Sequence, residues 1–166
     1  MKDKNNREVI VETLTTCIKH MPHKVNLYSY LIAVLSLEDF DFATLITKSV
    51  VQLLNEALVQ LGDCFMSKNA SRVLGNLAQY GLISSEAFCQ LLLQLIEDYQ
   101  KLPGADSLTG SKTHSADLLL ETVLAALPQT KQKMQKEQSI DFGTIVEYLK
   151  QIFKLRERAR QIQNPD

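Results

Sequence analysis

The sequence predicts an all-α fold, a HEAT- or armadillo-like solenoid of antiparallel helix pairs with about seven helices. Three observations lead to this prediction. Apolar residues recur every three or four positions along most of the chain, which is the spacing of one helical face. The 166 residues include only 4 prolines and 6 glycines, and several of these stand where a periodic segment ends. No run of alternating β-branched residues lies between turn signals, so no strand is expected.

Three long helices are predicted, over 42–61, 84–102 and about 141–161. Their apolar stripes include Leu45 and Leu53 in the first helix, Leu92 in the second, and Leu149 and Phe153 in the third. The residues expected at or just before their N-termini are Asp41, Ser84 and Ser139. The expected stops after the first two are Gly62 and Pro103.

Four shorter helices fit between the long ones, over 7–20, 24–36, 65–80 and 115–127. Pro22, Gly81 and Pro128 are expected to end three of them, because proline cannot continue a helix and glycine readily adopts the conformation that stops one. The polar, turn-forming run over 103–113 is predicted to be a mobile surface loop.

Internal repetition favours a solenoid. The pairs of apolar residues that repeat are Leu31 with Leu35, Val73 with Leu77, and Val123 with Leu127. Successive pairs are 42 and 50 residues apart (73 − 31 and 123 − 73), near the roughly 40–47 residues of HEAT and armadillo units. A closed helical bundle is the alternative. Residues 1–166 are expected to form a single helical-repeat scaffold domain.

Charge and cysteine usage narrow the classes of function. The net charge is −1, so no global basic field draws the chain to nucleic acid or to anionic membrane. Residues 1–128 sum to −4 (10 basic, 14 acidic) and 129–166 to +3 (8 basic, 5 acidic). Three scattered cysteines, Cys17, Cys64 and Cys89, suit a reducing compartment. With no signal peptide or membrane-spanning run expected, the setting predicted is the cytosol or nucleus.

The basic C-terminal helix holds the candidate partner or RNA surface, which consists of Lys150, Lys154, Arg156, Arg158 and Arg160. Three interpretations stay open: a solvated polar face, a contact with a protein or a following domain, and binding to an RNA backbone. Arg156 and Arg160 follow the apolar stripe, so these turns must leave the core or meet an acidic group, because an unpaired buried guanidinium is costly. Leu155 and Ile162 are the apolar candidates for contact with a following domain.

No catalytic, cofactor-binding or metal-binding residue is predicted. Cys17, His20 and His23 are spaced closely enough to suggest metal ligands, but the spacing matches no standard zinc module and a fourth ligand is not evident. The acidic residues around Asp39 and Asp41 stand where a helix begins, a position that favours negative charge without any catalytic role. We therefore expect a protein that is not an enzyme.

The segment from His23 to Phe42, with the proline before it, contains a Pro-x-Lys turn, a Tyr-x-x-Leu helix and an aromatic-x-Phe step. The residues of these motifs are Pro22, Lys24, Tyr28, Leu31, Phe40 and Phe42. In these motifs the segment resembles the first domain of the large subunit of the nuclear cap-binding complex. Residues 69–83 resemble the family's next helix and turn, residues 124–128 its helix ending in Leu-Pro, and residues 148–150 its Tyr-Leu-Lys step. Residues 116–123 depart from the pattern, because the family has an aromatic-rich helix there and this chain has no tryptophan.

The resemblance implies a non-enzymatic scaffold of stacked helical hairpins, of the kind first known from the middle of initiation factor four-gamma. It also implies the first domain of a longer, nuclear chain, with shuttling to the cytoplasm. The implied partners are a small RNA-recognition-motif subunit, held mostly by other domains, and RNA-processing or export proteins. RNA would be contacted indirectly, through the complex, and neither a cofactor nor a membrane is implied. The alternatives are a related initiation- or decay-factor scaffold that binds an RNA helicase, and a helical repeat that binds RNA directly.

Overall fold

The computed structural model describes residues 4–59, 64–102 and 111–163, with only the backbone described for 4, 111–113 and 162–163. These ranges form seven α-helices and one short 3-10 helix, and contain no strand. The elements are α1 Lys4–His20, η1 Pro22–Lys24, α2 Val25–Glu38, α3 Phe40–Val59, α4 Cys64–Tyr80, α5 Ser85–Lys101, α6 Ser111–Glu137 and α7 Ser139–Gln163. The predicted all-α fold is confirmed.

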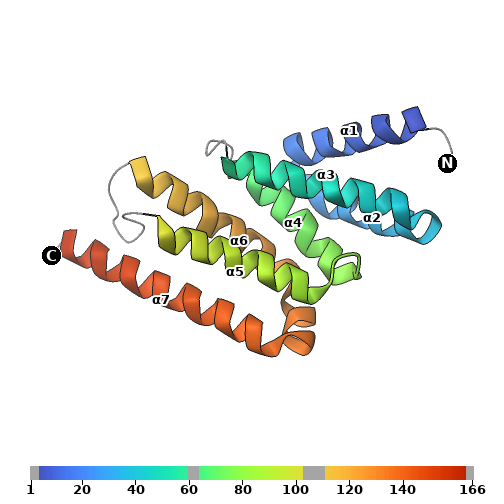
Figure 1. Ribbon diagram of the computed structural model, residues 1–166. Helices are drawn as coiled ribbons and strands as arrows, with labels where there is room; N and C mark the ends of the chain where they lie inside the picture. Colours follow the sequence, from blue (N-terminus) through green and yellow to red (C-terminus); the bar gives the residue numbers. More distant parts are fainter. Residues whose placement is uncertain (1–3, 60–63, 103–110, 164–166) are drawn as a thin grey trace.

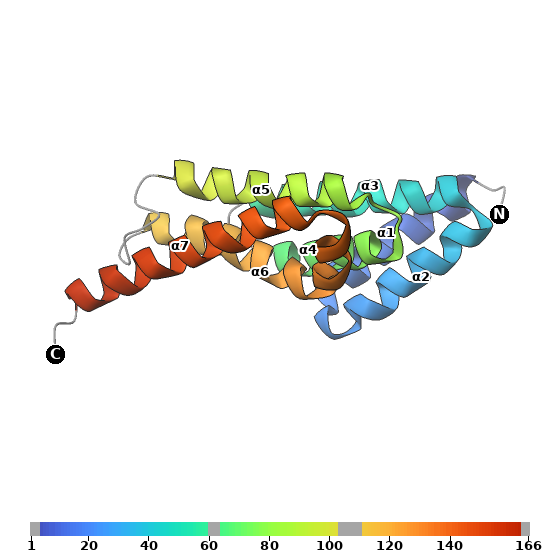
Figure 2. The same ribbon diagram turned by 90° about the horizontal axis from the view of Figure 1, so that it is seen from below.

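The helices stack into an elongated repeat with the two ends of the chain far apart (Figure 1). One row consists of α2, α4 and α6, each packed against the next, while α1, α3 and α5 run along the other side of the stack (Figure 2). α7 closes the far end by packing on α5 and α6. The three repeated apolar pairs found in the sequence fall on α2, α4 and α6, the helices of the first row.

α4 is the centre of the fold, because it contacts α1, α2, α3, α5 and α6. Val73, Leu74 and Leu77 on this helix are completely buried. Gly75 permits the close approach of α6, since a Cβ at this position would lie 3.0 Å from the carbonyl oxygen of Ala126. A larger residue at 75 would push the two helices apart.

Polar side chains of α4 are buried with partners. The Asn69 amide nitrogen Nδ2 donates to the carbonyl oxygen of Ile18, near the end of α1, at 3.1 Å. In a continuing helix that carbonyl would accept from residue 22, but Pro22 has no N–H, so Asn69 supplies the missing donor. Ser71 likewise donates to the carbonyl oxygen of Thr122 on α6 at 2.9 Å.

Three of the predicted helix starts are corrected by the structure. α3 is capped by Asp39, whose Oδ1 accepts from the Phe42 N–H at 3.0 Å, so Asp41 lies in the first turn and is not the cap. Asp39 also pairs with Arg7, which fixes its carboxylate over this helix start. α7 begins at Ser139 rather than after it, and α6 begins at Ser111.

One predicted N-terminal cap and one predicted C-terminal stop are confirmed. Ser84 caps α5 by accepting from the Ala87 N–H at 3.1 Å. Gly81, with φ of +86°, ends α4 in the left-handed conformation that glycine adopts without strain. Gly62 and Pro103, the stops expected after α3 and α5, lie outside the described residues.

Pro128 does not end its helix, contrary to prediction. α6 continues through it to Glu137. The proline removes one hydrogen bond and crowds the carbonyl four residues before it, but the turns beyond it are held by packing. Thr130 and Met134, which follow the proline, are buried. The predicted loop over 103–113 is also wrong for its last three residues, which belong to α6; positions 103–110 are outside the described residues.

Among the described helices, α3 alone is long and apolar enough, by length and composition, to cross a membrane. The same test is passed by helices that lie in protein cores. In this structure α3 packs against α1, α2 and α4, with Ile46, Val50 and Leu54 completely buried.

Candidate functional site

The predicted basic surface on α7 is split by the structure. Lys150, Lys154, Arg158 and Arg160 are exposed, and Lys150 lies 3.6 Å from a carboxylate oxygen of Glu147 on its own helix. The last turns of α7 extend past the other helices (Figure 2). Of the apolar candidates for contact, Leu155 is 44% exposed, and the side chain of Ile162 lies outside the described residues.

Arg156 instead holds α7 against α5 and α6. Its Nη1 lies 2.5 Å from Oδ1 of Asp117, its Nε donates to the Tyr99 hydroxyl at 3.1 Å, and its side chain is only 17% exposed. Burial lowers the pKa of Arg156, but the hydrogen bonds to Asp117 and Tyr99 outweigh that effect, so its pKa is raised. The expectation that a guanidinium here would meet an acidic group is confirmed.

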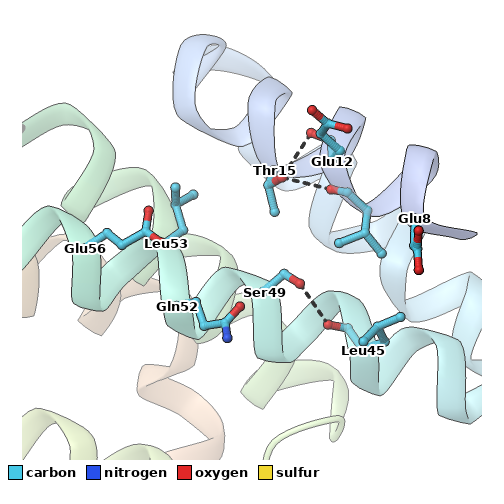
Figure 3. Close-up of a pocket in the computed structure, with 9 residues that line it drawn as sticks. Glu8, Glu12, Thr15, Leu45, Ser49, Gln52, Leu53 and Glu56 are labelled. Atoms are coloured by element: carbon cyan, nitrogen blue, oxygen red, sulfur yellow. Dashed lines mark hydrogen bonds between the residues drawn. The ribbon is translucent and has the colours of Figure 1, made fainter.

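A groove lies between α1 and α3 (Figure 3). Its volume is about 350 Å³. It is lined by Glu8, Val11, Glu12 and Thr15 from α1 and by Leu45, Ser49, Gln52, Leu53 and Glu56 from α3. On each helix these residues stand one, three or four positions apart, so they share one face.

The floor of the groove is apolar in character. The Thr15 hydroxyl donates to the Val11 carbonyl at 2.9 Å, and the Ser49 hydroxyl donates to the Leu45 carbonyl at 3.2 Å. Both hydroxyls are therefore bonded within their own helices and present mainly carbon to the groove. Leu53 points from α3 toward α1 (Figure 3).

The rim of the groove is acidic. Glu8 and Glu12 line it from α1 and Glu56 lines it from α3, and none of the described lining residues is basic. All three glutamates are exposed, so their carboxylates stand beside an apolar floor. Such a surface complements a helical or extended segment that carries an apolar side chain flanked by Lys or Arg. The sequence analysis missed this site, because it exists only when α1 and α3 pack side by side.

The cysteine and histidine candidates are not brought into a metal site. Among the described residues no group of three or more His, Cys, Asp and Glu is placed to hold a metal ion. Cys17 lies beside Tyr28, whose pKa is raised by burial and then by its hydrogen bond with that thiol. His20 and His23 are exposed.

Cys64 takes part in a contact that the sequence did not predict. Its thiol donates to Oε2 of Glu121 at 2.7 Å, and the same oxygen lies 2.9 Å from Nζ of Lys68. Burial, followed by this hydrogen bond, raises the pKa of the Cys64 thiol, so thiolate formation is disfavoured. Burial likewise raises the pKa of Cys89 to about 11. Cys64 and Lys68 therefore link α4 to α6 through Glu121 without an activated nucleophile.

No family model matches this chain, and no curated protein matches it significantly.

Proposed function

We propose that this chain is a non-enzymatic helical scaffold, part of a cap-binding-type large subunit, that docks the basic segments of RNA-processing and export proteins. The observation that carries the proposal is the acidic groove between α1 and α3. Proteins that handle RNA bind its phosphates through Lys and Arg, and their basic segments are therefore complementary to a groove with a glutamate rim. In this proposal a small RNA-recognition-motif subunit binds the capped RNA and is itself held mostly by other domains of a longer nuclear chain.

The placement of the residues behind the resemblance supports this proposal. Pro22 and Asn69 come from two separate segments that resemble the family, and they act together where α1 ends. Tyr28 and Phe42 from the first segment are buried core residues. The resembling segments therefore serve the helical scaffold, which is the role that the resemblance implies for them.

The first test is purification of the tagged, full-length protein from its own cells, with the bait length and stoichiometric partners read by mass spectrometry. We expect a bait longer than 166 residues and a small RNA-recognition-motif protein in equal amount. An RNA helicase as the stoichiometric partner, with no such small subunit, would favour the initiation- or decay-factor alternative instead.

The groove itself is tested by charge reversal in the same purification. The double variant Glu12→Lys/Glu56→Lys should lose the basic docking partners while the small subunit stays bound. Glu97→Lys/Glu157→Lys is the matched control, because both residues are exposed, lie outside the groove and change the net charge equally. Equal loss of partners from both variants would show that general charge, and not the groove, governs the docking.

Direct RNA binding is a second candidate, favoured by the four exposed cations of α7. It predicts an affinity that falls with salt by a log–log slope of about −0.7 for each phosphate contacted on a single strand. Binding of the purified chain to a single-stranded RNA without such a slope would remove this candidate.

A further inference from the structure

The outer face of α2 is apolar along its whole length, and none of the described helices covers it. Its exposed side chains, with their exposed fractions, are Leu27 58%, Tyr30 58%, Leu31 42%, Val34 40% and Leu37 84%. In Figure 2 this helix lies at the edge of the molecule, with its outer side open. Contiguous exposed apolar surface of this kind is typical of protein interfaces.

The spacing on this face is that of a helix-pairing seam. Lys24, Leu27, Leu31, Val34 and Glu38 follow one another at intervals of three, four, three and four residues. This is the repeat that lets two helices pack side by side over several turns. No charged residue occurs from Val25 to Leu37, so all the charge of the seam stands at its two ends.

The charges at the two ends have opposite signs. Lys24 and Glu38 are both exposed, and neither takes part in an ion pair between described residues. If two such helices met in parallel, Lys24 would face Lys24 and Glu38 would face Glu38. In an antiparallel pair each Lys24 faces the other copy's Glu38. The two helix dipoles then run in opposite directions, which is also favourable.

We propose that this face binds a second copy of the chain, in a two-fold dimer whose α2 helices pack antiparallel across Leu31. Leu31 lies midway between Lys24 and Glu38 in the sequence, so the two-fold axis passes close to it. A two-fold interface requires a patch that is complementary to itself, which this face is and the acidic groove is not. The inference does not rest on the proposed function.

The apolar area is widened by neighbouring residues. Tyr80 packs edge-to-face on Tyr30 with ring centroids 6.5 Å apart, and Met21 and Phe40 are exposed near the two ends of α2. Interfaces built mainly from one helix face stand at the small end of specific interfaces, so the dimer is expected to be weak and concentration-dependent.

The test is sedimentation equilibrium of the 166-residue chain up to about 300 µM, because small interfaces bind weakly. We expect a reversible monomer–dimer equilibrium, and the variant Leu31→Asp should be monomeric with unchanged circular dichroism. Lys24→Glu and Glu38→Lys should each weaken the dimer by about fivefold or more, since each creates like-charge contacts at both ends. The double variant K24E/E38K should restore it.

Matched controls distinguish this pairing from other association. Lys150→Glu makes the same charge change on α7 and should leave the equilibrium unchanged. A chain that stays monomeric throughout the concentration range overturns the proposal, as does a dimer that survives Leu31→Asp. A double variant no stronger than the single ones overturns the antiparallel arrangement.

Discussion

α4 buries polar side chains, whereas α2 exposes apolar ones. α4 carries Asn69, Ser71 and Asn76, yet these residues are buried, whereas α2 is almost wholly apolar and exposes most of its outer side chains. The cause is position in the stack. α4 is surrounded by five helices, which supply partners for its polar groups, while α2 stands at the end of its row and packs on only one side. Depth therefore follows the packing of neighbours and not hydrophobicity alone.

Truncation in the centre of α4 should have the largest effect. Leu74 is completely buried, so Leu74→Ala is expected to lower the free energy of unfolding by about 2–5 kcal/mol through lost burial and a residual cavity. Leu53, Leu92 and Leu149 are also buried, and we expect a loss in the same range when each is replaced by alanine. Urea denaturation followed by circular dichroism measures the change. A loss below about 1 kcal/mol at Leu74 would contradict the central place of α4.

Removing a buried polar contact should cost somewhat less. Asn69→Ala leaves the Ile18 carbonyl without the donor that Pro22 cannot supply, so we expect a loss of about 1–3 kcal/mol. Asn55→Ala on the exposed side of α3 is the control and should change the free energy of unfolding by less than about 0.5 kcal/mol. Equal effects of the two variants would mean that the buried amide has no special role.

Substitution of Arg156 shows whether α7, at the other end of the stack from α2, also depends on a polar contact. Arg156→Ala removes hydrogen bonds to Asp117 and Tyr99, with an expected loss of about 1–2 kcal/mol because Asp117 is partly solvated. Arg158→Ala, on the exposed face of α7, should be neutral. Thermal denaturation of both variants compares them directly, and a neutral Arg156→Ala would contradict the role assigned to this residue.

The ion pair between Lys68 on α4 and Glu121 on α6 is expected to give a pH-dependent effect below about 1 kcal/mol, since both side chains are partly exposed to solvent. Hydrogen bonds from Cys64 and then from Lys68 lower the pKa of Glu121. A lowered folded-state pKa means that the pair stabilises the fold above the ordinary glutamate pKa, and that this contribution is lost as pH falls through the lowered value. Denaturation of wild type and Glu121→Gln at about pH 7 and about pH 3 should show a gap that closes in acid. A difference in the free energy of unfolding that does not change with pH would contradict this role of Glu121.

The smallest effect on folding is expected on the outer face of α2. Leu27→Ser should change the free energy of unfolding of the dilute chain by no more than about 0.5 kcal/mol, because Leu27 is already 58% exposed. Urea denaturation at low protein concentration makes the measurement. A loss like that at Leu74 would mean that the face is covered within the monomer.

Periodicity predicted the helices well because it reports burial along one face. Leu92 and Leu149 are buried as their stripes require, while Phe153 and Leu45, at the margins of theirs, are 47% and 43% exposed. The failures at Asp41 and Pro128 differ in cause. The Phe42 N–H bond that makes Asp39 the cap is local, and only the ion pair of Asp39 with Arg7 is a tertiary contact. Packing carries α6 past its proline, which local rules could not include.

The candidate sites were less predictable. The sequence indicated that the turns after the α7 stripe must leave the core or meet an acidic group. Asp117, the acid that Arg156 meets, lies 39 residues earlier in the chain, and only the fold brings it close. The groove rim combines Glu12 with Glu56 from two helices that the sequence could not pair. The sequence predicted the helix α2, but which face of this helix is buried depends on its packing against α3 and α4.

Retention of the endogenous protein on a resin bearing the 7-methylguanosine cap tests the proposed scaffold role most directly. We expect the protein to be retained together with a small RNA-recognition-motif subunit and to be released by free cap analogue but not by unmethylated GTP. Recovery of the protein in the unbound fraction, with an RNA helicase as its partner and the small subunit retained without it, would contradict a place in the cap-binding complex.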